Sequence, residues 1–210
     1  MVGPPPRYVG RGGLKLERAL ETFALVPAGA TALDAGSSTG GFTDCLLQSG
    51  AARVIAVDVG TNQLHERLRA DPRVDSRENT DIRSLTRSKI EHEFDVRTGF
   101  DLIVADLSFI SATALLDTFA RLLASDGDMV VLVKPQFEAG RPEVSKGRGV
   151  IRDPDIWKRV LHEFIDAAVD AELEVTDLAI SPITGGKGNV EFLAHVRHGD
   201  ILVTHVEREN

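Results

Sequence analysis

Residues 33–42, with the sequence LDAGSSTGGF, constrain the fold of this chain more than any other stretch. They follow the apolar run 30–33 and precede a segment with helical spacing at Phe42, Leu46 and Leu47. A strand, a glycine-rich turn and a helix in this order are typical of a parallel α/β sheet. Such a turn presents backbone N–H groups and a helix N-terminus to a ligand at the carboxyl edge of the sheet.

The glycine spacing indicates which ligand this turn binds. It matches neither G-x-G-x-x-G nor G-x-x-x-x-G-K-[ST], the spacings typical of dinucleotide and phosphate loops. Asp34, two residues before Gly36, would repel a pyrophosphate but suits a ligand with a sulfonium and an ammonium group. We therefore predict S-adenosylmethionine rather than NAD. The predicted contacts within the turn are Asp34, Gly36, Ser37, Ser38, Thr39, Gly40, Gly41 and Phe42. Asp106, at the end of a later strand, is a further predicted cofactor contact.

Two further carboxylates are candidates for the adenosine part of this cofactor. Asp58 ends the apolar run 53–58, where an acidic side chain can accept hydrogen bonds from both ribose hydroxyls. Its alternative role is a helix N-cap, because Thr61 and Asn62 follow. Asp81 is a candidate for the adenine amino group, with a surface turn as its alternative role.

The remaining pattern predicts one α/β domain, a doubly wound sheet with helices between the strands. Residues 1–13 are expected to be an extended or mobile linker, 14–198 the domain and 199–210 a C-terminal tail. Residues 139–152 are expected to be a flexible basic loop over a cleft. Strands are expected near 31–35, 53–58, 74–78, 100–106, 128–133, 172–180 and 190–196, and helices near 14–25, 41–49, 63–70, 86–92, 112–124 and 153–171.

Charged residues at the ends of expected strands indicate catalysis. Asp106 and Lys134 each follow an apolar strand, Glu191 lies in the last strand, and Lys15 lies in the first turn of a helix, where a cation is poorly placed. Two amines and two carboxylates held together suit the activation of a weak acid such as a ribose 2′-hydroxyl, with Lys134 as the base. No metal is needed, because the six histidines lack ligand spacing.

Composition limits the class of protein. The net charge of −8 argues against a general nucleic-acid coat, although basic residues cluster near residues 7–18 and 134–152. No apolar run is long enough to span a membrane, and the N-terminus does not resemble a signal peptide. We expect a cytoplasmic protein.

Five stretches of the sequence carry a further signal: RGGLKL at 11–16, LDAGSSTGGFT at 33–43, VADLSFIS at 104–111, VKPQFE at 133–138 and GNVE at 188–191. Together they resemble one known family, the TlyA-type, FtsJ-like ribosomal RNA methyltransferases, many of which are also named haemolysin A. The resemblance covers about residues 10–197 in order. It implies the Rossmann-like class I methyltransferase fold, a mostly parallel seven-stranded sheet with helices on both faces. It further implies S-adenosylmethionine-dependent 2′-O-methylation of ribosomal RNA, usually at cytidine, with Lys15, Asp106, Lys134 and Glu191 as the family's Lys-Asp-Lys-Glu tetrad.

Family members usually carry an S4-type RNA-binding domain before the linker, and these 210 residues do not include one. We therefore expect cofactor binding but poor recognition of RNA by this chain alone. Three alternatives stay open: a membrane-active haemolysin, an enzyme of the same fold that methylates a base or a protein, and a cofactor-binding module that is inactive without its RNA-binding domain. The ribosomal subunit and the oligomeric state are not predicted.

Overall fold

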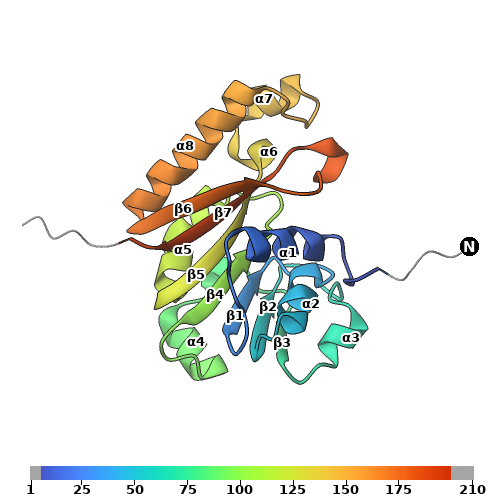
Figure 1. Ribbon diagram of the computed structural model, residues 1–210, viewed down its shortest axis with the longest axis vertical. Coiled ribbons are helices and arrows are strands. Elements are labelled where there is room, and N and C mark those ends of the chain that lie inside the picture. Colours follow the sequence, from blue (N-terminus) through green and yellow to red (C-terminus); the bar gives the residue numbers. More distant parts are fainter. Residues whose placement is uncertain (1–5, 200–210) are drawn as a thin grey trace, which may run out of the picture.

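The computed structural model describes residues 6–199, which form one seven-stranded sheet in the order β3-β2-β1-β4-β5-β7-β6 (Figure 1). The first five strands in this order are parallel, and β7 runs antiparallel to both β5 and β6. This confirms the predicted seven-stranded, mostly parallel sheet. The strands are β1 (Thr31–Ala35), β2 (Arg53–Val57), β3 (Val74–Arg77), β4 (Phe100–Ala105), β5 (Leu123–Val133), β6 (Leu173–Ile180) and β7 (Phe192–His198).

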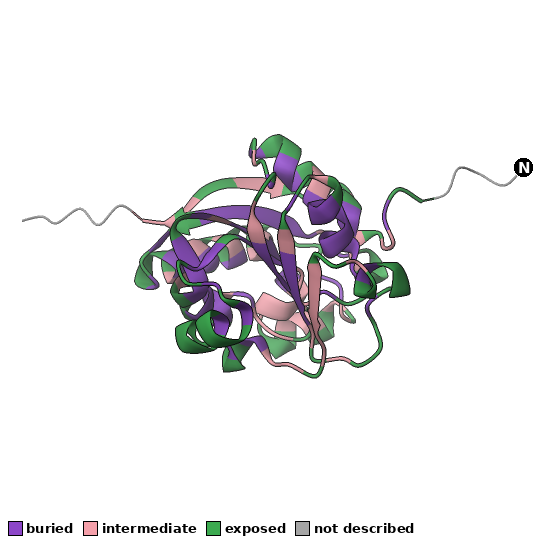
Figure 2. Ribbon diagram, turned by 90° about the horizontal axis from the view of Figure 1, so that it is seen from below, coloured by how far each residue is buried: buried purple, intermediate pink, exposed green. Residues whose placement is uncertain are grey.

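Helices cover both faces of the sheet because alternate strand residues point to opposite sides. Leu33 belongs to a core shared with α4, α5 and α8, whereas Ala32, its neighbour in β1, belongs to a core shared with α1, α2 and α3. Figure 2 shows the buried strands running through the middle of the molecule with exposed helix surfaces outside. The helices are α1 (Gly12–Thr22), α2 (Gly41–Gln48), α3 (Glu66–Arg69), α4 (Arg87–Phe94), α5 (Leu116–Leu122), α6 (Pro135–Glu138), α7 (Arg141–Lys146) and α8 (Pro154–Asp170), with short 3₁₀ helices η1 (Ile82–Ser84), η2 (Thr113–Leu115) and η3 (Gly186–Gly188).

The N-terminal segment departs from the prediction of an extended linker. Helix α1 begins at Gly12, so the expected boundary after residue 13 falls inside a helix. Tyr8 is only 5% exposed and packs into the core beside α1 and α2. The Val9 N–H donates to Asp44 Oδ2 over 2.9 Å, which ties this segment to α2. Residues 1–5 and the predicted tail beyond residue 199 lie outside the described residues.

Residues 139–152 were predicted to be a loop, and this was wrong for the part that forms α7. Pro142 lies in the first turn of this helix, where a missing N–H costs nothing. Three other differences are smaller. The helix predicted at 63–70 forms only as α3, the strand predicted at 128–133 begins at Leu123, where the helix predicted to run to 124 has already ended, and the last strand begins at Phe192. Glu191 therefore lies just before β7 rather than within it.

Candidate active site

The four residues predicted to form a tetrad lie together in the structure. Lys134 Nζ is 2.5 Å from Asp106 Oδ1, and Lys15 Nζ is 3.2 Å from Asp106 Oδ2 and 2.7 Å from Glu191 Oε2. Lys15, Lys134 and Glu191 are each at most 8% exposed. The result is a charge-balanced row in which the carboxylate of Asp106 lies between two ammonium groups.

The strand order explains why residues so far apart in sequence meet. Asp106 and Lys134 directly follow the neighbouring parallel strands β4 and β5, so both lie at the carboxyl edge of the sheet. Because β7 is antiparallel to β5, with Val133 opposite Phe192, the start of β7 brings Glu191 to that same edge. Lys15 reaches the edge from α1, which packs on the face of the sheet (Figure 1).

Three cavities meet at Asp106. A cavity of about 660 Å³ extends towards Gly36, Asp58 and Asp81. A smaller one of about 170 Å³ runs along the glycine-rich turn, and a third of about 530 Å³ contains Lys15, Lys134 and Glu191. Asp106 lines all three. A group bound in the first cavity can therefore contact a group bound in the third beside this carboxylate.

The turn after β1 needs its glycines. Gly36 has φ +83°, and a Cβ atom there would lie 3.0 Å from the backbone oxygen of Asp106. Gly40 has φ +96°, and a Cβ there would collide with Leu68. Ser37 N–H donates to Val57 O over 3.1 Å, which fastens the turn to the end of β2. The turn thus brings bare backbone to the cavity wall, as a closely bound cofactor requires.

Asp58 lies at the end of β2, where the prediction placed it, and lines the 660 Å³ cavity. Its carboxylate accepts the N–H groups of Ser38 at 2.8 Å and Gly60 at 2.7 Å, so its orientation is fixed by backbone donors. Asp81 lines the same cavity, but its carboxylate already pairs with the Arg83 guanidinium and caps η1. These contacts of Asp81 favour its alternative role in a surface turn.

Asp34 lies beneath the glycine turn and is fully buried. Thr43 Oγ1 donates to Asp34 Oδ2 over 2.6 Å, and within the described part of the chain Asp34 Oδ1 has no hydrogen-bond partner. The pKa of Asp34 is raised from 3.8 to about 7, chiefly by burial. The nearby carboxylates of Asp106 and Asp58 add to this rise, and the hydrogen bonds with Thr43 oppose it. The predicted contact of Asp34 with a cofactor stays a prediction.

Sequence reasoning missed three side chains beside the tetrad. Lys134 Nζ donates to Ser108 Oγ over 3.3 Å, and Gln136 Nε2 donates to Glu191 Oε1 over 3.2 Å. Phe109 is 92% exposed at the mouth of the 530 Å³ cavity, with its ring centroid 5.4 Å from that of Phe137. Ser108, Phe109 and Gln136 each lie two or three residues after Asp106 or Lys134, which were selected because they follow strands. This closeness in sequence is the only signal that pointed to them.

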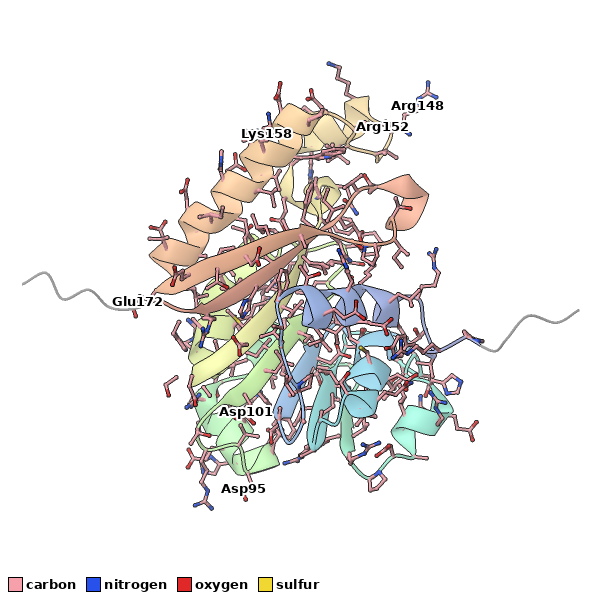
Figure 3. The ribbon with its side chains drawn as sticks, in the orientation of Figure 1. Asp95, Asp101, Arg148, Arg152, Lys158 and Glu172 are labelled. Carbon is pink, nitrogen blue, oxygen red and sulfur yellow. The ribbon has the colours of Figure 1, made fainter. Side chains whose placement is uncertain are left out.

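Exposed basic side chains lie around the 530 Å³ cavity and near α7. Figure 3 shows Arg148, Arg152 and Lys158 at the end that carries α7, whereas Asp95, Asp101 and Glu172 lie away from it. Arg11 and Lys187 line the 530 Å³ cavity and are exposed. An overall negative chain therefore presents cations around this cavity. Within residues 6–199 no group of three or more His, Cys, Asp and Glu side chains is arranged to hold a metal ion.

Comparison with solved structures defines the class of the fold. An S-adenosylmethionine-dependent methyltransferase from Listeria monocytogenes superposes with a TM-score of 0.64 at 15% identity, over 91% of this chain and all of that one. This likeness confirms the predicted Rossmann-like methyltransferase fold. A haemolysin-named protein from Streptococcus thermophilus superposes with a TM-score of 0.86 at 46% identity, over 95% of this chain and 70% of that chain.

Sequence comparison then identifies the family. The model for FtsJ-like methyltransferases matches residues 8–198, and the chain belongs to this family. The 16S/23S rRNA (cytidine-2′-O)-methyltransferase TlyA of Mycobacterium tuberculosis is 44% identical over 90% of this chain and 68% of its own length. Hemolysin A of Brachyspira hyodysenteriae is 43% identical over 90% of this chain and 76% of its own length. The resemblance predicted from the five stretches is confirmed.

Proposed function

We propose that this chain transfers a methyl group from S-adenosylmethionine to a ribose 2′-hydroxyl of ribosomal RNA, with cytidine as the target nucleotide. The observation that carries the proposal is the position of the Asp106–Lys134 pair, at the junction of a nucleoside-sized cavity and a second, cation-rimmed cavity. Membership of the FtsJ-like family and the name of the TlyA relative support the substrate class.

The cofactor fits the cavities that contain the glycine turn. A volume of about 660 Å³ is typical of a site for a ligand of this size. The bare backbone at Gly36 and the oriented carboxylate of Asp58 provide a wall and an acceptor for the ribose hydroxyls. When bound there, S-adenosylmethionine supplies an electrophilic methyl group on a sulfonium.

The tetrad acts on the hydroxyl of the RNA. After losing one ammonium proton to solvent, Lys134 would accept the 2′-hydroxyl proton, so that the ribose oxygen could attack the methyl group that the bound cofactor would supply. Asp106 holds the amine of Lys134 through Oδ1, while Lys15 occupies Oδ2 and is itself held by Glu191. Ser108 gives Lys134 a second fixed partner. Proximity and orientation supply a large part of the acceleration.

The RNA approaches through the 530 Å³ cavity. The exposed ring of Phe109 at its mouth is a platform for an unstacked base, and Arg11 and Lys187 face the phosphates. Because ribosomal RNA is the substrate, we propose that the protein acts in the cytoplasm. Among residues 6–199, no helix is long and apolar enough to cross a membrane.

The test is to incubate the chain with labelled S-adenosylmethionine and ribosomal RNA, and then to hydrolyse the RNA with alkali. A methyl group on a 2′-oxygen blocks cleavage at that nucleotide, so the label should remain in an alkali-resistant dinucleotide. Label released in mononucleotides would show base methylation and contradict the proposal. Cofactor binding without any label would favour the alternative of a module that depends on another RNA-binding domain.

A further inference from the structure

The side chain of Asn189 joins two loops that are far apart in sequence. It is 3% exposed, and its three hydrogen bonds all go to backbone groups. Asn189 Oδ1 accepts the N–H of Ile151 at 3.0 Å, while Nδ2 donates to the oxygens of Gly149 at 2.9 Å and Gly186 at 3.1 Å. A buried amide with all three bonds made fixes both loops, since each broken bond would leave an unpaired polar group.

Both loops form walls of the 530 Å³ cavity. Gly149 lines it from the segment after α7, and Gly186 and Lys187 line it from the loop between β6 and β7 (Figure 1). Val144 of α7 lines it as well. None of these four residues lines the 660 Å³ cavity. Asn189 therefore acts on the cavity proposed for RNA and not on the cavity proposed for the cofactor.

The same loop also carries part of the tetrad. Asn189 is two residues before Glu191, and its backbone oxygen accepts the N–H of Gly185 at 2.9 Å. A Cβ atom at Gly185 would collide with Glu191 Oε1, so the loop packs directly against this carboxylate. A shift of the loop would therefore displace Glu191 relative to Lys15, which lies 2.7 Å from it.

We propose that Asn189 is a positioning residue for the RNA substrate. It holds the segment after α7 against the β6–β7 loop, so that the wall of the RNA cavity and Glu191 keep one fixed geometry. This inference rests on the proposed function, because it assigns the cavity to RNA.

Asn189→Asp is the sharpest variant. It keeps the shape and the acceptor for the Ile151 N–H, but it places an oxygen where an N–H₂ group now faces the carbonyl oxygens of Gly149 and Gly186. The matched control is Arg159→Ala, which breaks the exposed ion pair of 2.5 Å between Arg159 and Glu143 of α7 and leaves the buried amide in place.

The measurements are amide hydrogen exchange, the cofactor dissociation constant and RNA methylation kinetics. For Asn189→Asp we expect exchange at Gly149 and Ile151 to accelerate at least tenfold and kcat/KM for RNA to fall at least tenfold. The cofactor dissociation constant should change by less than twofold. Arg159→Ala should match the wild type in all three.

Two results would overturn the inference. Unchanged exchange in both loops would show that Asn189 does not hold them together, whatever the activity. Cofactor affinity that falls in parallel with RNA methylation would show a general loss of structure instead of positioning. If the wild-type chain methylates no RNA, the proposed function has failed, whereas the exchange data still decide whether Asn189 fixes the two loops.

Discussion

The buried carboxyl of Asp34 gives a prediction whose size follows from the structure. Its pKa is raised from 3.8 to about 7. Between these two pH values the folded chain holds a proton that the unfolded chain has released, so raising the pH lowers the free energy of unfolding. At 1.36 kcal/mol per pKa unit, the cost of this carboxyl is about 2 kcal/mol at pH 5 and about 4 kcal/mol at pH 8.

The variant Asp34→Asn removes the titration and keeps an acceptor for the hydroxyl of Thr43. Its new N–H₂ group replaces Oδ1, which has no hydrogen-bond partner in the described part of the chain. This replacement changes the free energy of unfolding by the same amount at every pH. We expect the stability of the variant relative to wild type to rise by about 2–3 kcal/mol from pH 5 to pH 8. Urea unfolding at both pH values measures this difference. A stability difference that is the same at both pH values would refute the assignment.

Two further predictions concern the cavities. Asp58→Ala should weaken S-adenosylmethionine binding by about 10- to 100-fold in calorimetry, because it removes a charged hydrogen-bond acceptor worth about 1.5–3 kcal/mol and frees the Ser38 and Gly60 amides; an unchanged dissociation constant would contradict this. Phe109→Ala should lower kcat/KM for RNA about tenfold, since stacking on a base is worth about 1–3 kcal/mol. Its melting temperature should not change because the ring is 92% exposed, and a lowered one would point to a structural role.

The sheet and the strand-end residues were predictable because they depend on local patterns. The apolar runs that end in Asp58, Asp106 and Lys134 mark parallel strands, and the carboxyl ends of such strands meet at one edge. The glycine turn was predictable for the same reason, since its conformation is set by its own residues. Position along the chain was therefore enough to place three charged groups at the same edge of the sheet.

The parts that sequence reasoning missed depend on contacts between distant residues. Tyr8 is buried because it packs against residues of α1 and α2, and the Val9 N–H donates a hydrogen bond to Asp44. The role of Asn189 rests on bonds to residues about forty positions earlier. A proline- and glycine-rich segment or a lone asparagine carries no periodic signal, so their partners emerge only when the sheet is assembled.

The central claim is that Lys134 removes the proton of the RNA hydroxyl, and single-turnover methylation with cofactor and RNA both saturating tests it most directly. The variant is Lys134→Met, which keeps the length of the side chain, and the control is Lys89→Met at an exposed position of α4. We expect the rate constant of Lys134→Met to fall by about 10²- to 10⁴-fold, with cofactor affinity and the Lys89→Met rate unchanged. A Lys134→Met rate within threefold of wild type would show that another group takes the proton.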